Sequence, residues 1–358
     1  MKRLLFLICS LALGTSLSAQ TQVTDYKPGV TDDGITYFLP QTQVRVVLSA
    51  TKTHYEPGEF AMYAERYLRL KNVTQKAYDV WTIDNVALYT YGVADKTKAY
   101  SIKLKHKTSA PLVSLAPDGR LLSINAAASE SDEQLPQASV TPIKEKVING
   151  ADCMTEEILS AGSVAKMAEL TANEIYDIRE NRGLLNKSQA DFMPKDGEQL
   201  KLMLANLDEQ ETGLLQLFRG THTSEKHVIT FDVAPKVNGE KQVVCNFSKY
   251  LGAVDADDPA GIPLYITVTD LNTLPAVQTA PNAKAKKEVE DVRYVVPGRA
   301  QVRVFNDEKE LASQSFPMAQ CGRVEHLGGE LFNKKNTTHV QLSGTTGGIV
   351  KIDAERPQ

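Results

Sequence analysis

Residues 35–55 read ITYFLPQTQVRVVLSATKTHY, and this stretch decides the fold class. Apolar Val44, Val46 and Leu48 stand at every second position, which places them on one face of an extended chain. A hydrophobic period near two predicts a half-buried β-strand. The Pro-Gly pair at 57–58 interrupts the pattern, so we expect a long strand that stops just before it.

The same β character returns on both sides of a helical centre. Alternating or β-branched runs predict further strands at 78–83, 86–91, 101–105, 112–115, 120–124, 228–233, 242–247, 264–268, 300–305, 338–342 and 349–352. The sequence APDG at 116–119 has the turn chemistry of a hairpin. Two segments rich in small and polar residues, 125–146 and 279–290, predict loops or linkers.

Helices are expected at three places. An apolar face of mainly aromatic residues predicts a helix over 59–70, just after a proline that suits a first turn. The central region holds two longer helices, and the first covers 163–182. The second begins at Asp196, with Gln199 three residues on as in a capping box, and ends at Gly220.

These patterns predict an α+β protein in which sandwich-like β-rich parts flank a central helical segment. We place a signal peptide at 1–19, a β-rich N-terminal domain at 20–146, a helical segment at 147–220 and a β-rich C-terminal domain at 221–358. The sequence leaves open whether the two β-rich parts share one core.

The first 19 residues, MKRLLFLICSLALGTSLSA, have the three parts of a cleavable secretory signal. A basic start at 2–3 and an apolar run at 4–13 precede small residues that lead to a cut after Ala19. The apolar run is shorter than the roughly 20 residues that a membrane-spanning helix needs. We therefore expect an exported, soluble protein of the periplasm or outer membrane, with no transmembrane segment after signal cleavage.

Composition narrows the class of protein further. The formal net charge of −4 gives no electrostatic reason to expect nucleic acid or an anionic membrane as a partner. Beyond the signal, Cys153, Cys245 and Cys321 remain, and this odd number leaves at least one thiol outside any intramolecular disulfide. Their spacing does not choose a pair. A hydrophobic core, rather than a disulfide framework, must hold the fold.

Ser163-Val164-Ala165-Lys166 matches the S-x-x-K pattern of penicillin-interacting serine enzymes. In that interpretation Ser163 is the catalytic nucleophile and Lys166, one helical turn on, is its base. No Lys-Thr-Gly motif follows, and the Ser-x-Asn motif at 123–125 precedes the pattern instead of following it. We favour the simpler interpretation that Ser163 caps the helix that begins there.

Asp255, Asp257 and Asp258 form an acidic loop that is a candidate for weak calcium binding, because Ca²⁺ prefers carboxylates at alternate positions. Pro259 takes a would-be ligand position, and Ile266 stands where a bidentate glutamate is required. An acidic turn between strands is the favoured interpretation. The sequence contains no HExxH and no CxxC motif, so we predict no metal and no cofactor.

Two further groups of side chains have competing interpretations. Trp81, Tyr89 and Tyr91 are candidates for a sugar- or protein-binding patch, with core or cross-strand packing as the alternative. Carboxylates such as Glu209 and Glu211 on the helices are candidates for a glycosidase pair. Charges on helices more often belong to a solvated face with i,i+4 pairing, which is the interpretation that we favour.

Several segments carry a family resemblance: GITYFLP at 34–40, the expected helix at 56–70, YDIRENR at 176–182, MPKDG at 193–197, LFRG at 217–220, YVVPG at 294–298 and MAQCG at 318–322. Together they resemble a secreted family of Bacteroidota-type bacteria described only as a domain of unknown function (domain of unknown function 4831). The resemblance covers nearly the whole mature chain and implies a cell-envelope protein. It carries no catalytic residues over to this sequence.

Two functions remain open at this point. The exported location, the β-rich flanks and the lack of a catalytic constellation favour a non-enzymatic binding or assembly subunit at the periplasmic face of the outer membrane. Other envelope proteins are its expected partners, and the oligomeric state is left open. The alternative is an exported hydrolase that acts on cell-wall or dietary glycan, which the S-x-x-K pattern and the unassigned carboxylates motivate.

Overall fold

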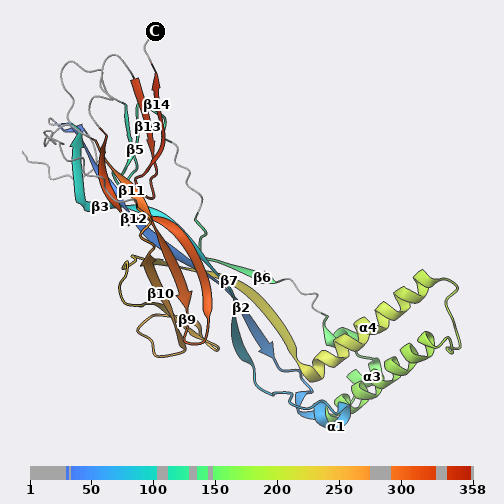
Figure 1. The fold of residues 1–358 in the computed structure, drawn as a ribbon. Helices are drawn as coiled ribbons and strands as arrows, with labels where there is room; N and C mark the ends of the chain where they lie inside the picture. Colours follow the sequence, from blue (N-terminus) through green and yellow to red (C-terminus); the bar gives the residue numbers. More distant parts are fainter. Residues whose placement is uncertain are drawn as a thin grey trace, which may run out of the picture.

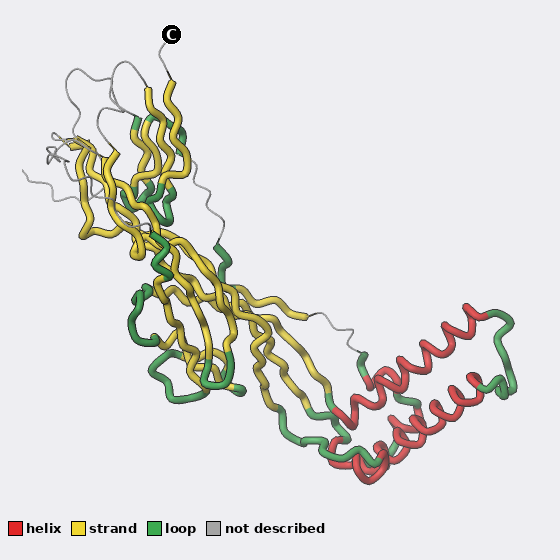
Figure 2. The backbone as a smooth tube through the Cα atoms, in the orientation of Figure 1, coloured by secondary structure: helices red, strands yellow, loops and turns green. Residues whose placement is uncertain are grey.

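The computed structural model describes residues 30–31, 34–102, 112–128, 135–143, 148–274, 292–327 and 337–355. They form an elongated molecule in which two β-sandwiches lie end to end and a helical arm extends from one end (Figure 1, Figure 2). The α+β, strand-rich class predicted from the sequence is confirmed. Among the described helices, none combines the length and the hydropathy that a membrane span requires.

The described strands are β1 Val30–Thr31, β2 Gly34–Glu56, β3 Tyr78–Ile102, β4 Val113–Leu115, β5 Leu121–Ile124, β6 Ser139–Ile143, β7 Thr221–Val233, β8 Gln242–Ser248, β9 Gly252–Val254, β10 Ile262–Asp270, β11 Val292–Phe305, β12 Glu310–Leu327, β13 Thr337–Leu342 and β14 Ile349–Glu355. The α-helices are α1 Ala64–Leu68, α2 Glu156–Leu159, α3 Val164–Asn186 and α4 Gly197–Arg219, and the 3₁₀ helices are η1 Ala61–Tyr63 and η2 Gly150–Cys153.

These strands pair into antiparallel sheets that join distant parts of the chain. The first sheet has the order β3–β2–β7–β6 with β1 added at the start of β2, the second β12–β11–β10–β8–β9, and the third β14–β13–β5–β4. β2 pairs with β7 from Val44 opposite Val233 to Glu56 opposite Thr221. β13 likewise pairs with β5. The β-rich parts placed at 20–146 and 221–358 therefore share their sheets, which answers the question that the sequence left open.

Two hydrophobic cores hold the β-rich body together. In the middle sandwich, the first and second sheets face each other around residues such as Leu48 and Ile266. The distal sandwich, farther from the helical arm, combines Tyr37, Val295 and Val340, one residue from each sheet. The hairpins β2–β3 and β11–β12 run through both sandwiches, so the two form one continuous body (Figure 1).

The two long hairpins are irregular at the level where the sandwiches meet. The strand register shifts beside Pro40 in β2 and beside Pro297 in β11, because proline has no N–H for the ladder. The fully buried Thr42 ties the hairpins together at this level. Its N–H donates to Gln320 Oε1 at 3.2 Å, and its carbonyl accepts from Gln320 Nε2 at 2.6 Å.

The helical arm has a core of its own. Helices α1, α3 and α4 pack around buried Phe60, Ile175 and Phe218, and the rings of Phe60 and Phe218 lie 5.4 Å apart. The chain passes into the arm twice, between β2 and β3 and again between β6 and β7. Both insertions start from the same end of the first sheet, so two separate segments build one arm (Figure 1).

The predicted helix boundaries agree well with the structure where a cap defines them. Asp196 Oδ1 accepts the N–H of Gln199 at 2.7 Å, as the capping box requires. Gly220, with φ of 79°, ends α4 as predicted. The helix expected at 163–182 continues to Asn186, whereas the one expected at 59–70 is limited to η1 and α1.

Two local expectations need correction. The separate strands expected at 78–83, 86–91 and 101–105 belong to one strand, β3, as far as Ile102, because a β-bulge accommodates the polar residues at 84–85 that looked like a break. The loop expected at 125–146 contains the edge strand β6, whose residues are all exposed and therefore show no hydrophobic period. The loop expected at 279–290 lies outside the described residues.

Candidate functional site

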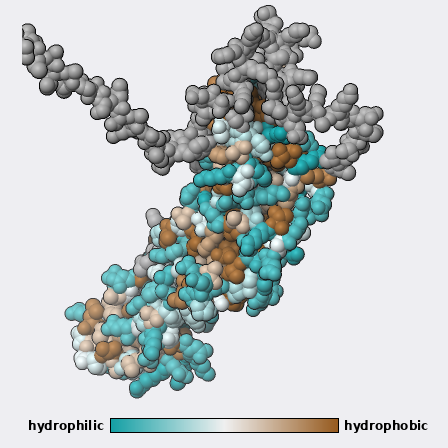
Figure 3. Space-filling view, turned by 90° about the vertical axis from the view of Figure 1, so that its left-hand side faces the viewer, coloured by the Kyte–Doolittle hydropathy of each residue, from teal (hydrophilic) through white to brown (hydrophobic). Residues whose placement is uncertain are grey.

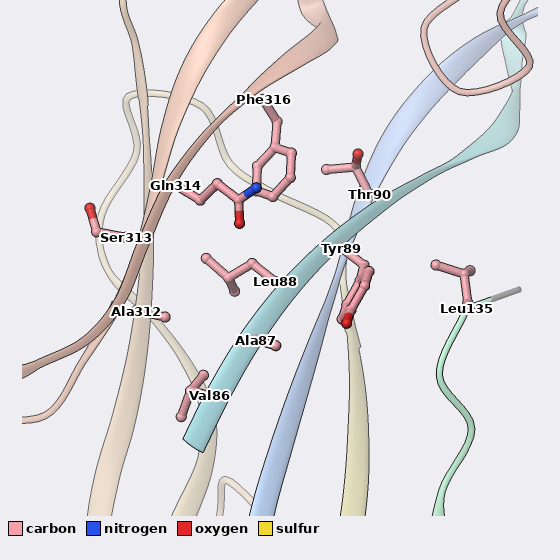
Figure 4. A pocket seen from close by; sticks show the side chains of 10 residues that line it. All are labelled: Val86, Ala87, Leu88, Tyr89, Thr90, Leu135, Ala312, Ser313, Gln314 and Phe316. Atoms are coloured by element: carbon pink, nitrogen blue, oxygen red, sulfur yellow. The ribbon is translucent and has the colours of Figure 1, made fainter. Parts of the chain in front are cut away.

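A cavity of about 670 Å³ lies in the middle sandwich between β3 and β12, and we call it the edge groove. Its walls are formed by residues 86–90 of β3, residues 312–314 and Phe316 of β12, and Leu135 (Figure 4). The groove exists because β3 and β12 are the edge strands of the two sheets that face each other there. The sandwich is thus open along one side.

The edge groove has a mixed lining in which the deepest residues are apolar. Val86 and Leu88 belong to the middle core and are 7% and 6% exposed, while Phe316 is half-buried. In Figure 4 these three side chains point into the space between the two strands, and Tyr89 lies on the opposite side of β3. Hydrophobic side chains also gather midway along the molecule on the face seen in Figure 3.

The described residues that line the edge groove are apolar or uncharged and polar. Among them there is no carboxylate, imidazole, thiol, amine or guanidinium group, and Tyr89 is the one titratable side chain. Ser313, Gln314 and Thr90 supply the groove's polar side chains. A site of this composition offers apolar contact and hydrogen bonds, whereas nucleophilic and general acid–base catalysis need an activated or titrating group.

The S-x-x-K residues lie far from the edge groove, at the start of α3 in the helical arm. Ser163 is exposed, and its Oγ accepts the N–H of Lys166 at 3.3 Å as an N-cap. Lys166 is exposed as well, and its ammonium lies 3.0 Å from Glu169 Oε1. The structure therefore places Ser163 in the capping role and engages Lys166 in a surface ion pair.

The acidic loop is a turn between β9 and β10. Asp255 and Asp257 are exposed, and Asp258 uses its carboxylate to accept the N–H of Ala260 at 2.8 Å. The side-chain amide of Asn246 donates to the carbonyl of Asp258 and holds the turn in place. Within the described ranges, no group of three or more histidine, cysteine, aspartate or glutamate side chains is placed to hold a metal ion.

The three aromatic residues do not form one patch. Tyr89 and Tyr91 share the outer face of β3, where Arg45 lies over the Tyr91 ring. The β-bulge at 84–85 reverses the alternation, so Trp81 faces the second sheet instead. There its ring lies against Gly252 and 4.5 Å from the His227 ring. Tyr89 and Tyr91 therefore lie on one face of the first sheet and Trp81 lies on the other.

A polar cluster on β2 and β3 escaped the sequence analysis. His54 Nδ1 lies 2.6 Å from Asp79 Oδ1, and His54 Nε2 lies 3.3 Å from Glu56 Oε2. Lys52 Nζ lies 3.1 Å from the second oxygen of Asp79. The hydrogen bond to Asp79 raises the pKa of His54 above its usual 6.5, and the same bond lowers the pKa of Asp79.

This arrangement favours the protonated imidazole, which has no lone pair with which to accept a proton. The cluster is therefore an ion-pair network on the surface of the sheet. The spacing of His54 and Glu56 places them on one strand face and was visible in the sequence. Their partner Asp79 lies on the neighbouring strand, and only the pairing of β2 with β3 brings it close.

The helical carboxylates also need correction, because Glu211 is buried. Its side chain is 8% exposed and pairs across the helical hairpin with Arg179 Nε at 2.6 Å and Arg182 Nη1 at 2.7 Å. Asp208 adds a second carboxylate beside Arg182. Two arginines neutralise this glutamate, so it fastens α3 to α4 and does not form an opposed catalytic pair with Glu209.

All three described cysteines are free thiols. Burial raises the pKa of the Cys245 thiol to about 12 and that of Cys321 to about 11. Burial also raises the pKa of Cys153, which lies beside Gly213 of α4. A raised thiol pKa lowers the fraction of reactive thiolate, so these cysteines act as small apolar core residues.

Comparison with known proteins gives one match. The model of a family described as "Domain of unknown function (DUF4831)" matches residues 33–350, which include both sandwiches and the helical arm. Searches of curated proteins and of solved structures gave no significant match. The match confirms the family resemblance found in the sequence and concerns neither the source nor the location of the protein.

Proposed function

Since the chain belongs to the DUF4831 family, whose description assigns no activity, we propose from its structure that it is a non-enzymatic binding or assembly subunit of the cell envelope. The observation that carries this proposal is the chemistry of the edge groove. The groove offers apolar side chains beside open strand edges, together with the hydroxyl and amide groups of Thr90, Ser313 and Gln314, and the described residues that line it include no charged side chain. A concave surface that combines apolar side chains with polar groups able to form hydrogen bonds is typical of a binding site.

The positions of the candidate catalytic residues support the same proposal. Ser163 and Lys166 lie on the helical arm, and Asp255, Asp257 and Asp258 lie on a turn of the second sheet. Neither the edge groove nor the smaller cavity at His339, about 200 Å³ in volume, is lined by any of them. A hydrolase needs its acid, base or nucleophile within reach of one bound substrate.

The envelope location in this proposal rests on the sequence. The signal peptide at 1–19 supports export, and the family resemblance supports the periplasmic face of the outer membrane, with other envelope proteins as partners. Cell fractionation followed by N-terminal sequencing tests this part. We expect the mature chain in the envelope fraction with Gln20 as its first residue, and an uncleaved chain in the cytosol would contradict it.

Site-specific photocrosslinking in intact cells tests the binding role. A photoreactive residue at Gln314, an exposed position of the edge groove, is expected to give reproducible adducts with one or a few envelope proteins. The matched control carries the same residue at Gln189, an exposed glutamine of the helical arm. Absence of adducts from Gln314, or the same adducts from both positions, would contradict binding at the groove.

A further inference from the structure

We propose that the edge groove binds an extended peptide strand of another protein, which adds to the open edge of β3 and inserts every second side chain between β3 and β12. This inference rests on the proposed function and specifies its partner by chemistry. The partner is a segment with an unpaired backbone and with apolar side chains at alternate positions. In this mode of recognition, main-chain hydrogen bonds give affinity and the groove gives specificity.

The edge of β3 is covered at both ends and open between them. At one end the N–H of Trp81 donates to the carbonyl of Lys249 at 2.7 Å. At the other end Gly92 lies so close to Gly344 that a Cβ would stand 2.0 Å from its carbonyl oxygen. Between these contacts, in the described part of the chain, the backbone of β3 pairs with β2 alone.

An open antiparallel edge presents specific hydrogen-bonding groups. Every second residue of an edge strand directs its N–H and C=O away from the neighbouring strand. Residues 82–91 therefore offer about five residues whose backbone donors and acceptors are available to an added strand. The residues at 86–90 lie within this open part and also line the edge groove. Backbone pairing and side-chain insertion thus occur at the same place.

A strand added to β3 would run along the residues that line the groove. A strand added to β3 would lie about 4.8 Å from it, and residues 86–90 span about 13 Å along its axis. Successive side chains of the added strand point to opposite faces, so two or three of them reach toward Leu88 and Phe316 while the others face solvent. This alternation is the reason that the partner is expected to be apolar at every second position.

A second copy of this chain does not supply such a strand. Each described strand already pairs along at least one edge, and the long strands bury their apolar face in a sandwich of their own. If β3 of a second copy paired edge to edge with β3 of the first, its apolar side chains would stay in their own sandwich and the groove would remain unfilled. The exposed strand β6 is five residues long and contains Pro142, which has no N–H to donate. We therefore assign the groove to a segment that is not part of a folded sheet.

The first experiment uses the purified full chain and a pool of nonapeptides with Val, Ile, Leu or Phe at alternate positions and Thr or Lys between them. Retained peptides are identified by mass spectrometry. Each is then made in two forms, one N-methylated at the odd-numbered residues and the other at the even-numbered residues, so that each form lacks the N–H donors along one edge of the peptide strand. We expect one form to bind at least about tenfold more weakly, because it loses several ladder hydrogen bonds, and the other to bind unchanged.

The second experiment locates the bound peptide. Hydrogen exchange is expected to slow by about tenfold or more at residues 86–90 and to stay unchanged at 139–143, the opposite edge of the same sheet. Gln314→Asp, which places a charge in the groove, is expected to weaken peptide binding at least about tenfold. Gln189→Asp adds the same charge to an exposed site on the arm and is expected to bind like the unchanged protein.

Four outcomes would overturn the inference: no peptide of the pool is retained, both N-methylated forms bind equally, protection appears away from residues 86–90, or the chain associates with itself or with another of its own segments at β3. The result for strand addition is separable from the proposed function. If Gln314 crosslinks envelope proteins in cells while every peptide fails, the binding role stands and the extended-strand partner is wrong.

Discussion

Replacing Glu211 with alanine is expected to loosen the helical arm and to leave the β-rich body intact. Removal of one member of a buried ion pair costs about 3–5 kcal/mol, because the remaining charge has lost its partner. The two arginines that contact Glu211 have side chains that are 35% and 32% exposed, so water already solvates them in part. We therefore expect a smaller loss of local stability, about 2 kcal/mol.

Hydrogen exchange is the suitable assay, since it reports the arm and the body separately. A loss of about 2 kcal/mol corresponds to roughly 30-fold faster exchange of the most protected amides of α3 and α4, with those of β2 as an internal reference. Asp208→Ala is the matched control on the same helix. Asp208 contacts Arg182 but is 58% exposed, so we expect less than about 1 kcal/mol and at most about fivefold faster exchange.

Two results would refute this reasoning. Similar exchange rates in the Glu211 and Asp208 variants would mean that burial adds nothing to the ion pair. Faster exchange in β2 as well as in the arm would mean that the arm does not open as a separate unit, even though its core around Phe60 and Phe218 is distinct from the two sandwich cores.

Three further predictions concern other parts of the molecule. Gly252→Ala should lower the free energy of unfolding by about 1 kcal/mol or more, because Gly252 has φ of 78° and a Cβ there would lie 2.9 Å from the tryptophan ring. Gly183→Ala, in open space within α3, should instead raise it by about 0.5–1 kcal/mol, and thermal unfolding compares the two. Because the pKa of His54 is raised, its pairing adds stability that is complete below pH 6.5 and is lost as the pH rises through the raised pKa. Because the pKa of Asp79 is lowered, its pairing adds stability that is lost at acid pH, where the carboxylate becomes protonated. The melting temperature of His54→Gln should therefore fall below that of the unchanged protein most clearly between about pH 4 and 6.5, and an equal difference at every pH would contradict this. Because burial raises the pKa of Cys245 to about 12, a thiol reagent at pH 8 should leave Cys245 unmodified in the native chain and modify it after unfolding in guanidinium.

The features that the sequence predicts correctly depend on neighbouring residues. The alternation through 35–55 identifies β2 because burial of one strand face imposes a period of two. The cap at Asp196 and the end of α4 at Gly220 follow from hydrogen bonds and a backbone angle within a few residues. Such local signals give the fold class and many of the elements, although they miss β6 and β12.

The features that the sequence does not predict depend on contacts between distant segments. The pairing of β2 with β7 joins residues that are more than 150 positions apart, and a helical segment of the arm separates them. The bulge at 84–85 places Trp81 on the opposite face of the sheet from the one that strict alternation predicts, because one extra residue moves every residue beyond it to the other face. No local pattern contains either fact.

The edge groove is the clearest example of this limit. Its two walls come from residues 86–90, where the sequence predicts a strand, and from residues 312–316, where it predicts none. They form a site because β3 and β12 are the edge strands of two facing sheets and lie on the same side of one sandwich. Catalytic sites often leave a motif because the chemistry demands particular residue types, whereas an open strand edge uses backbone groups that every residue possesses.

The joint between the arm and the body links these observations. One residue, Gly220, separates α4 from β7, and a Cβ there would lie 2.3 Å from the carbonyl oxygen of Glu56. The N–H of Phe60 donates to the carbonyl of Leu217 at 2.7 Å, so the arm is also fastened to the chain that leaves β2. Contacts on both sides of the joint limit how far the arm can bend relative to the first sheet. On the proposed function, a partner strand bound at β3 and a second partner on the arm would then be kept within a narrower range of distances than a flexible linker allows, which suits an assembly subunit.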